Sequence, residues 1–558
     1  MCVSRWSKLG LAVLSLAVSL GCGGSGGGGG PDGGNGNACT ITGVSVVASA
    51  PTVNPNQGDL VAATVASIGS CTGAVTWSAS PGGGTLTPSG STAMFTSATP
   101  GTYTLTAKSN DDATKSGSAS VIVKPPCGTA NGTVVTHTTN ITASEAWAGD
   151  GTTHQIPNSI QIKAPAVVTI GSCAIVQIGA SADIDIVGDI TNNVPAKVIA
   201  AGTDLTTAFI HFEPMSGSAN WGYFRGLNQQ SFLELHDAIL TQGGNGNTFG
   251  AHAPIYMIGP GHFLLPQGVL TLDQVAIDQP VGAAVFLDSG AAFTIQSTGF
   301  GVSNATDYPV QLEMMATGSI PAYEGQSNTQ DAAMVIGPSF NIFADLTITN
   351  HMPLYITQNI NVAPPAGTSS LLGVTLTLQP GAELRFKPRD PNAGTNAQGI
   401  RMVFGGVGNP GANPIGRLIA VGLPTSQIRF TSASPTPGPG DWAGLQLLNA
   451  TGSVMAFNIV EYAGAPGGYV SANCRPTSSS DAAALVVGGT DFVPLSTLLT
   501  SSIIQSSAGH GIDAVWANGQ VDEPDLTPGN LFNDIQGCKQ TYNGLTAGSC
   551  PVGGGCTQ

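Results

Sequence analysis

Short apolar runs, each broken after a few residues by Gly, Pro, Asn or Asp, follow one another along most of the chain. In "GRLIAVGLPTSQIRFTSASPTPGPGDWAGL", residues 416–445, apolar and polar residues alternate briefly before each turn sequence. Alternation with a period of two predicts β-strands with one buried face, and the Gly and Pro residues predict tight turns between them. Charged residues make up only 9% of the chain, so helices with charged faces are hard to place. The pattern therefore predicts an all-β protein.

Residues 39–125 contain such runs at the spacing of a small β-sandwich: "VSVVAS", "LVAATVAS", "AVTWSAS", "AMFTSA", "TYTLTAKS" and "SASVIV". Trp77 and Tyr103 supply large side chains for a core between two sheets. The segment resembles the bacterial Ig-like (Big) modules of surface proteins. The resemblance implies an Ig-like β-sandwich over 39–125, which in most such proteins is a spacer or stalk and in a minority binds a ligand.

The remainder of the chain repeats its own sequence. Three features recur in the same order: "SADIDI" at 181–186 and "GAELRF" at 381–386, "VIAAG" at 198–202 and "LIAVG" at 418–422, and Trp221 and Trp442. Residues 391–414 have no counterpart in the earlier stretch and are rich in Gly, Asn and Pro, so we expect a loop there. The matches predict an internal duplication, with copies at 127–350 and 351–558.

The strands expected in both copies are too short for a wide sheet, and no helical crossover pattern lies between them. A coil in which each turn stacks on the previous one solves both problems, because every strand pairs with the turns above and below it. Inward Ile, Val, Leu, Phe and Ala residues would then form stacked columns, with Gly and Asn at the sharp corners. The sequence therefore predicts a solenoid of parallel strands.

Several motifs of this body resemble the right-handed parallel β-helix repeats of bacterial cell-surface proteins. They are "VTLTLQPGAELRF", "GRLIAVG", "IRFTS", "GDWAGL" and "NIVEYAG". The resemblance covers 373–515 almost motif for motif, whereas the first copy is degenerate and lacks the Pro-Gly. It implies a right-handed parallel β-helix over 127–558, with a Cys-rich cap at its C-terminal end.

Residues 1–21 have the features of a secretion signal. Arg5 and Lys8 precede an apolar run that is too short to span a membrane as a helix. Gly21 and Cys22 at the end of this run resemble the lipobox of bacterial lipoproteins, which implies that Cys22 becomes the lipidated first residue of the mature protein. The two preceding residues depart from the lipobox pattern, which leaves ordinary cleavage or an uncleaved anchor open.

Residues 22–38 are dominated by Gly, the composition of a flexible tether. By the sorting habit of lipoproteins, the Gly residues that follow Cys22 imply the outer membrane rather than the inner one. We therefore expect a lipoprotein of the cell envelope that is anchored to the outer membrane, with its periplasmic or external orientation left open.

Eight cysteines are left after the leader residue Cys2 and the lipid-bearing Cys22 are set aside. Many pairings are allowed, but the cysteines fall in clusters that favour local disulfide bonds, as in exported proteins. No C-x-x-C or paired Cys/His spacing occurs, which argues against a metal site. The pairs that we expect are Cys39–Cys71, Cys127–Cys173, Cys474–Cys538 and, by elimination, Cys550–Cys556.

The chain is acidic, with 16 Lys and Arg residues against 32 Asp and Glu residues and a formal net charge of −16. It contains neither a basic run nor interleaved basic and aromatic residues, which are the features of nucleic-acid binding. No nucleic-acid partner is therefore expected.

Charged residues stand out on one strand of the first copy. In "DIDIVGD" the alternation turns Asp183 and Asp185 outward and Ile184 and Ile186 inward, with Asp189 close behind. Carboxylate oxygens are the ligands that Ca²⁺ prefers, so these three aspartates are a candidate Ca²⁺ site. Surface charges that keep an exposed strand soluble and unpaired are the ordinary alternative.

A second charged group lies on the matching strand of the second copy. In "ELRFKPRD" the residues Glu383, Arg385 and Lys387 point outward. Basic side chains on an exposed β-helix sheet can clamp an acidic sugar, so this group is a candidate ligand face. Ion pairing between neighbouring strands is the ordinary alternative. No catalytic residue is assigned.

Aromatic and histidine residues offer weaker candidates. Trp221 and Trp442 hold matching places in the two copies, which favours structural plugs at corners over platforms for sugar stacking. The neighbours His211 and Glu213, and likewise His236 with the acidic residue after it, are candidate acid–base pairs without a counterpart in the second copy.

Three functions are consistent with the sequence. The first is a lipid-anchored surface protein that presents a β-helix face to polysaccharide or to another cell-surface partner. A polysaccharide lyase or glycoside hydrolase acting along the same face is the second, and a scaffold without a ligand is the third. Beyond the candidate Ca²⁺, no cofactor is expected.

Overall fold

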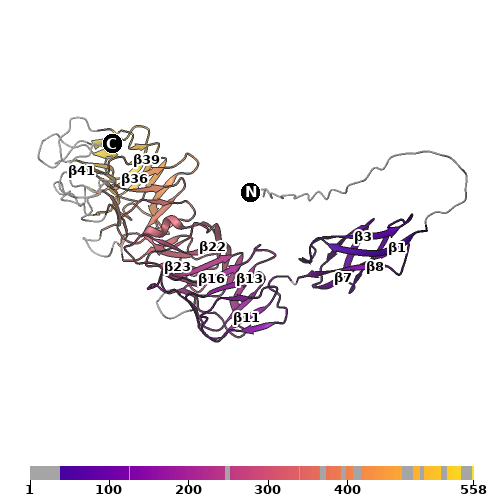
Figure 1. Ribbon diagram of the computed structural model, residues 1–558. Coiled ribbons are helices and arrows are strands. Elements are labelled where there is room, and N and C mark those ends of the chain that lie inside the picture. Colours follow the sequence, from indigo (N-terminus) through magenta and orange to yellow (C-terminus); the bar gives the residue numbers. More distant parts are fainter. Residues whose placement is uncertain are drawn as a thin grey trace, which may run out of the picture. The chain divides into compact units, whose positions relative to one another are not determined.

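A small β-sandwich and a long parallel β-helix follow each other along the chain in a computed structural model (Figure 1). The predicted all-β fold class is therefore confirmed. The structure describes residues 38–124, 126–245, 252–338, 340–364, 373–390, 392, 398–405, 416–467, 482–489, 496–516, 524–541 and 556–557.

Two four-stranded sheets form the sandwich, with the strand orders β1-β3-β6-β5 and β2-β8-β7-β4. The rings of Phe95 and Tyr103 lie 5.1 Å apart in its core. Trp77 is 9% exposed and Tyr103 is 2% exposed, so both predicted core residues are buried. The strands are β1 Thr40–Ala48, β2 Thr52–Val53, β3 Asp59–Ile68, β4 Val75–Ser80, β5 Gly84–Ser89, β6 Thr92–Ser97, β7 Gly101–Ser109 and β8 Ser116–Val123.

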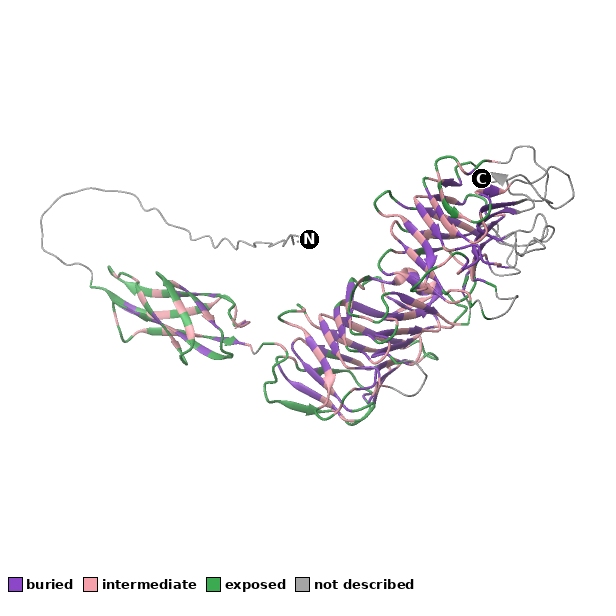
Figure 2. Cartoon of the chain, turned by 180° about the vertical axis from the view of Figure 1, so that it is seen from behind, coloured by how far each residue is buried: buried purple, intermediate pink, exposed green. Residues whose placement is uncertain are grey.

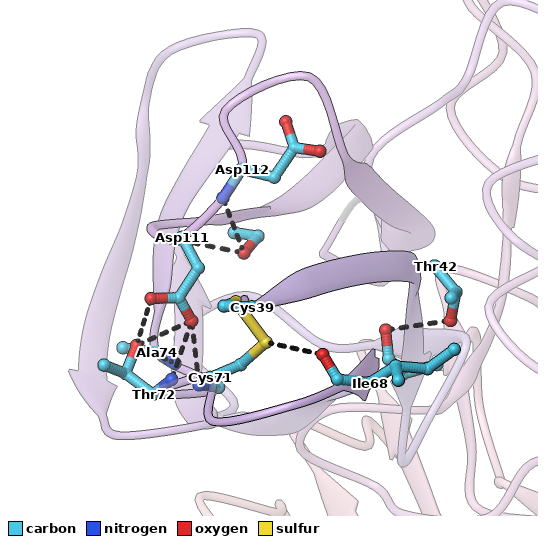
Figure 3. The surroundings of a disulfide bond; sticks show 11 residues. Cys39, Thr42, Ile68, Cys71, Thr72, Ala74, Asp111 and Asp112 are labelled. Carbon is cyan, nitrogen blue, oxygen red and sulfur yellow. Dashed lines mark hydrogen bonds between the residues drawn. A yellow bond between two sulfur atoms is a disulfide. The ribbon is translucent and has the colours of Figure 1, made fainter. Parts of the chain in front are cut away.

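The Cys39–Cys71 disulfide bond joins the residue before β1 to the segment after β3 (Figure 3). The Asp111 carboxylate lies beside it and accepts hydrogen bonds from the Thr72 hydroxyl and from the Thr72 and Gly73 amides. These bonds tie the loop after β3 to the turn after β7, so the disulfide belongs to a fixed end of the sandwich.

A second predicted disulfide bond, Cys127–Cys173, lies at the start of the β-helix. Cys538 is also disulfide-bonded. The side chains of Cys474, Cys550 and Cys556 lie outside the described residues, so the other two predicted pairings stay predictions. The two disulfide bonds indicate an extracytoplasmic protein. In the described part of the chain, no helix has the length and apolar character needed to cross a lipid bilayer.

In the first turns of the β-helix, from β10 to β19, consecutive strands lie on different sides of the coil, and each pairs in parallel with the strand three places later. Strand β13 pairs with β10 and β16, and β14 pairs with β11 and β17. Strand β15 pairs with β12 and β18 in the same way. Three strands therefore make one turn, as the solenoid prediction requires.

One sheet, here called the continuous sheet, runs along the whole β-helix. In order, its strands are β12 Ile160–Lys163, β15 Ile184–Val187, β18 Phe224–Gly226, β21 Ile255–Ile258, β23 Val285–Asp288, β26 Val310–Glu313, β28 Ala333–Ile336, β31 Leu354–Ile356, β34 Glu383–Phe386, β37 Ile428–Ser432, β40 Asn458–Glu461, β43 Ile503–Ser507 and β45 Leu531–Ile535.

The other two sides of the first half belong to one branched sheet, because the long strand β22 turns a corner and pairs on both sides. Its strands are β9 Val134–Thr136, β10 Glu145–Trp147, β11 Thr153–Ile156, β13 Val167–Gly171, β14 Ile175–Ile178, β16 Ala196–Ala201, β17 Ile210–Pro214, β19 Ser231–His236, β20 Ala238–Thr241, β22 Gln267–Asp278, β24 Ala291–Phe293, β25 Gly299–Ser303 and β27 Ala322–Gln326.

In the second half these two sides are separate sheets of eight and five strands. The eight-stranded sheet contains β29 Asn341–Ile342, β32 Ile360–Val362, β35 Arg401–Phe404, β38 Gly444–Leu448, β41 Ala483–Gly489, β44 His510–Trp516, β46 Gln540–Thr541 and β47 Cys556–Thr557. The five-stranded sheet contains β30 Leu346–Ile348, β33 Val374–Leu378, β36 Gly416–Val421, β39 Val454–Ala456 and β42 Leu499–Thr500.

A 3₁₀ helix marks the change between the two halves. This helix, η1, spans Met314–Ser319 and packs against β24, β29 and β30. The continuous sheet passes the change without interruption, because β26, β28 and β31 stay paired. The change in sheets lies a short distance before residue 350, the predicted boundary between the copies.

Buried residues recur along the stacked strands of the coil (Figure 2), and the apolar ones among them form one continuous core. On the continuous sheet Ile184, Phe224, Ile255, Val285 and Val310 stand in register, and each is at most 1% exposed. Burial of one such side chain stabilises the fold by about 1.5–3 kcal/mol. The apolar half of the alternating pattern therefore accounts for the core.

Gly and Asn form some of the corners as predicted, for example Gly290 before β24 and Asn449 after β38, but other residues form corners too. A single left-handed residue separates β19 from β20 and β39 from β40, and these residues are Asp237 and Phe457, with φ of 44° and 53°. Gln274, with φ of 54°, bends β22 at the same kind of corner. The left-handed conformation costs such residues about 1–2 kcal/mol, which the stacked strands on both sides of each corner can offset.

The segment 391–414 was expected to be a loop, and that expectation is wrong in part. Its residues 401–404 form strand β35, which pairs with β32 and β38. Because of this additional strand, the strands that follow it in the second copy lie one side of the coil further on than their matches in the first copy. Strand β15 and its match β34 share the continuous sheet, whereas β17 lies in the branched sheet and its match β37 lies in the continuous sheet. The two copies therefore share a local unit of one strand, a corner and the next strand, but not the side of the coil on which that unit lies.

Candidate functional site

An outward row of side chains runs along the continuous sheet and includes several of the predicted site residues. Its members occupy matching positions on successive strands and alternate with the buried columns. From β12 to β37 this central row consists of Gln161, Asp185, Arg225, Tyr256, Phe286, Gln311, Met334, Tyr355, Arg385 and Thr431.

Asp185 points away from the core as predicted, but it is covered by its neighbours and is only 4% exposed. Both of its carboxylate oxygens accept hydrogen bonds from Arg225, from Nε and Nη2 at 2.7 Å each. The guanidinium also lies over the Tyr223 ring, 5.4 Å from its centroid. Asp185 is therefore one partner of a closed ion pair.

The other two aspartates of the candidate Ca²⁺ site have separate roles. The Asp183 carboxylate accepts a hydrogen bond from the Tyr223 amide at 3.3 Å. Burial raises the pKa of Asp183 to about 6, although Arg225 opposes the shift. Asp189 accepts bonds from the Thr191 and Asn192 amides within its own turn. In the described part of the chain, the structure does not bring the three carboxylates together as a set of metal ligands.

Glu383 and Arg385 also lie on the continuous sheet, on β34. Arg385 Nε donates to Glu383 Oε1 at 2.7 Å, and the two side chains are 33% and 26% exposed. The ion pair lies within one strand rather than between neighbouring strands. Lys387 is exposed just after the strand, and its amide donates to the Ile356 carbonyl.

Two stacked tyrosines adjoin Arg385. Tyr308 and Tyr355 have ring centroids 4.7 Å apart and an interplanar angle of 5°. Tyr355 stands in register with Arg385 on the next strand, and both tyrosines are half-buried. Burial raises the pKa of each phenol. We call Tyr308, Tyr355, Glu383 and Arg385 the tyrosine–arginine patch.

A second polar group lies on the same sheet at the ends of β23 and β26. Asp288 and Glu313 end these adjacent strands, and His262 reaches both from the loop before β22. One ligand atom from each lies within 4.8 Å of the others, a spacing that could hold a metal ion. Ser289 Oγ lies 3.4 Å from His262 Nε2. We call His262, Asp288, Ser289 and Glu313 the His262 cluster.

Hydrogen bonds fix the acidic members of the His262 cluster. The Tyr256 hydroxyl donates to Asp288 Oδ2 at 3.1 Å. The Gly290 amide donates to Glu313 Oε2 at 2.9 Å, while Glu313 Oε1 bonds to His262 Nδ1. The hydrogen bond that His262 donates to the Glu313 carboxylate raises the pKa of His262, and burial raises the pKa of Glu313. The arrangement can hold and move a proton at His262.

Sequence reasoning missed both tyrosines and the whole His262 cluster. Tyr355 had a readable signal, because it alternates with the apolar residues Leu354 and Ile356. Tyr308 and His262 lie in loops, where no periodicity indicates the direction of a side chain. His262 and Glu313 are also 51 residues apart in the sequence.

Trp221 and Trp442 are fully buried, which confirms the prediction of structural plugs. Each indole Nε1 donates to a backbone carbonyl of the following turn at 2.8 Å, that of Thr241 and of Glu461 respectively. Because no ring face is open, neither tryptophan can stack on a sugar.

The predicted acid–base pairs lie on the branched sheet. His211 Nδ1 lies 3.2 Å from Glu213 Oε2. Thr241 Oγ1 lies 3.4 Å from His211 Nε2, on the side of the ring opposite Glu213, and its hydroxyl also donates to the Phe212 carbonyl. His236 Nδ1 pairs at 3.1 Å with Asp273 on the next turn, and not with Asp237, the partner expected from the sequence.

Comparisons with protein-family models, with curated proteins and with solved structures gave no match.

Proposed function

We propose that this protein is a lipid-anchored surface protein of the outer membrane that binds an acidic polysaccharide along its continuous sheet, at the tyrosine–arginine patch. In this proposal the lipid on Cys22 anchors the chain to the membrane. The Gly-rich tether and an Ig-like stalk of the Big type connect this anchor to the β-helix. The β-helix belongs to the right-handed cell-surface type.

The observation that carries the proposal is the stacked pair Tyr308 and Tyr355 beside Arg385. Aromatic rings pack against the apolar faces of sugar rings, and their hydroxyls offer hydrogen bonds at the edge. Among the hydrogen bonds of the described residues, Arg385 uses only Nε, for Glu383. Its terminal nitrogens suit the planar, two-pronged recognition of a carboxylate such as that of a uronic acid.

The shape of the sheet suits an extended polymer. The central row continues on both sides of the patch, with Met334 before Tyr355 and Thr431 after Arg385. Successive strands are about 4.8 Å apart, so one sugar residue of roughly 5 Å spans about one strand. A chain of several sugars could therefore contact several members of the row.

The full-length protein, solubilised in detergent, would be tested by affinity electrophoresis in gels that contain polygalacturonate, alginate or a neutral glucan. We expect the acidic polymers to slow its migration. Arg385→Gln and Tyr355→Ala should each reduce this retardation at least fivefold. Lys197→Gln is the matched control, because Lys197 is 33% exposed like Arg385 and is paired with Glu234 on the branched sheet.

Equal retention of the neutral glucan, or unchanged retention in Arg385→Gln, would contradict an acidic ligand at this patch. Retention of no polymer at all would favour the scaffold function. Cleavage of a polymer, seen as new reducing or unsaturated ends, would favour a lyase or hydrolase instead.

A further inference from the structure

The geometry points to a second activity in the His262 cluster. We propose that Ser289, His262 and Glu313 act as nucleophile, base and orienting acid in the hydrolysis of carboxylic esters. This inference does not depend on the polysaccharide-binding proposal, because the cluster shares no residue with the patch: it lies at the C-terminal ends of β23 and β26, whereas the patch lies on β31 and β34 and at Tyr308, before the start of β26.

The three side chains are connected in the order that nucleophile activation requires. Ser289 Oγ lies 3.4 Å from His262 Nε2, and His262 Nδ1 bonds to Glu313 Oε1. A proton on Nδ1 is therefore directed to the carboxylate, which leaves Nε2 as the acceptor for the serine proton. A metal ion on Nδ1 would displace the bond to Glu313 and would leave Ser289 without a role.

Glu313 is the most buried of the three residues, and His262 is the most exposed. The Glu313 side chain is 7% exposed, and the Gly290 amide at 2.9 Å holds its second oxygen. The His262 side chain is 38% exposed, and Ser289 is half-buried. A reactant can therefore approach Ser289 and His262, while Glu313 is held in place behind them.

The backbone at Ser289 is unusual for a residue with a side chain. Its φ is 51°, in the left-handed region that favours glycine. Structural corners such as Asp237 and Phe457 have the same conformation, so its importance here lies in where it places the Ser289 side chain. Ser289 follows directly after strand β23, so this turn lifts its side chain beyond the end of the continuous sheet.

Asp288 adds a second negative charge near the histidine. Its Oδ1 lies 3.9 Å from His262 Nδ1, and the Tyr256 hydroxyl holds its other oxygen. The charges that face His262 are therefore Asp288 from β23 and Glu313 from β26, with the phenol of Tyr256 from β21 behind Asp288. Together they stabilise the imidazolium ion that forms when His262 accepts a proton.

An apolar surface follows His262 directly in the sequence. Phe263, Leu264 and Leu265 are 69%, 55% and 62% exposed. Contiguous exposed apolar side chains mark sites of contact with apolar ligands or surfaces. An ester with an apolar acyl chain can place its carbonyl at Ser289 and its chain against this loop.

In the first step, Ser289 Oγ attacks the ester carbonyl carbon while its proton passes to His262 Nε2. The ester C–O bond then breaks, and the proton passes from His262 to the leaving alcohol. In the second step, water attacks the acyl-serine, gives a proton to His262 and releases the carboxylic acid, while Ser289 recovers its proton. Ester and water are consumed, and acid and alcohol are formed.

The amides of Ser289 and Gly290 donate to Asp288 and Glu313, so they do not stabilise the oxyanion. Loss of one oxyanion donor typically costs about 10²–10³ in rate. We therefore expect slow turnover, and covalent labelling is a better first measurement than the catalytic rate constant.

The full-length protein would be incubated with a fluorophosphonate probe and the adduct located by mass spectrometry. We expect labelling at Ser289, abolished in Ser289→Ala and reduced at least tenfold in His262→Gln, with the rate increasing as the pH rises and His262 loses its proton. Ser327→Ala is the matched control, because Ser327 also follows a strand with φ of 56°. Its labelling should equal that of the wild type.

Hydrolysis of p-nitrophenyl acetate, butyrate and octanoate gives the second measurement, and we expect the longer esters to react faster. Labelling that persists in Ser289→Ala, or equal labelling of His262→Gln, would overturn the triad. Hydrolysis that a chelator stops and that survives in Ser289→Ala but not in Asp288→Asn would overturn it in favour of a metal site. Retention of acidic polymer by Ser289→Ala is a separate result, which tests the binding proposal alone.

Discussion

Two arginine–carboxylate pairs lie in or beside the central row of the same sheet, and they differ in burial. Arg225 and Asp185 make two hydrogen bonds of 2.7 Å, and their side chains are 14% and 6% exposed. Arg385 and Glu383 make one bond of 2.7 Å, and their side chains are 33% and 26% exposed. The contact distance is the same in both pairs, so distance alone does not separate structural from functional charge.

The difference in burial determines what each pair can do. Asp185 has both oxygens occupied, and the Arg225 guanidinium lies over the Tyr223 ring. A ligand could displace those contacts only by leaving a buried charge without its partner. Arg385 lies in a solvated position, where exchange of partners costs little. The closed pair is therefore structural, and the open pair is available to a ligand.

Arg225→Met should have the largest effect on stability, because it leaves the buried carboxylate of Asp185 unpaired. We expect the free energy of unfolding to fall by about 3–5 kcal/mol, as in other buried pairs that lose one partner. Urea denaturation followed by circular dichroism would measure the loss. Arg385→Met is the matched control and should cost less than about 1 kcal/mol. Equal losses in the two variants would contradict the distinction between closed and open pairs.

Asp183 lies near the closed pair and should make the free energy of unfolding depend on pH, an effect of intermediate size. Its pKa is about 6 in the folded chain and about 3.9 in an unfolded one. Between these values the folded state holds a proton that the unfolded state releases, so stability falls as the pH rises through this window. We expect a loss of ~1 kcal/mol, because the half-buried carboxyl is partly screened by solvent.

Urea midpoints measured between about pH 4 and about pH 6.5 would test this expectation. Asp183→Asn should flatten the decrease and should be the more stable protein at pH 7. A wild-type midpoint that rises with pH across the same window would show that other carboxylates dominate the linkage.

Much of the fold could be predicted because the alternation of apolar and polar residues shows which face of a strand is buried. The alternation around Asp185 placed Ile184 and Ile186 in the core, where both are found. The local sequence does not indicate the side of the coil on which a strand lies, because that side depends on how many strands precede it. The short strand β35 lies in a segment rich in Gly and Asn and was not predicted. It places every later strand of the second copy on a different side of the coil from its match in the first copy.

The site was less predictable for a related reason. The sequence indicated which way Arg385 and Glu383 point, but not that the preceding turn would place Tyr355 beside Arg385 in register. Alternation also indicated that Asp185 points away from the core, yet it could not show that Arg225 would cover it. The direction of a side chain is local information, whereas its partners come from turns that lie tens of residues away.

Glu383→Gln should have the smallest effect on stability, and its main effect should be on the binding of acidic polymer. An exposed ion pair is worth about 0.2–1 kcal/mol, so the free energy of unfolding should change by less than about 1 kcal/mol. The substitution frees Arg385 and removes a negative charge next to the expected ligand carboxylate. Acidic polymer should therefore bind about two- to fivefold more tightly in affinity electrophoresis, and the gain should shrink at high salt. Weaker binding would instead mean that Glu383 itself contacts the sugar or holds Arg385 in its binding orientation. The Arg385–Glu383 ion pair would then be needed intact for binding, and Arg385 would not have to exchange Glu383 for the ligand.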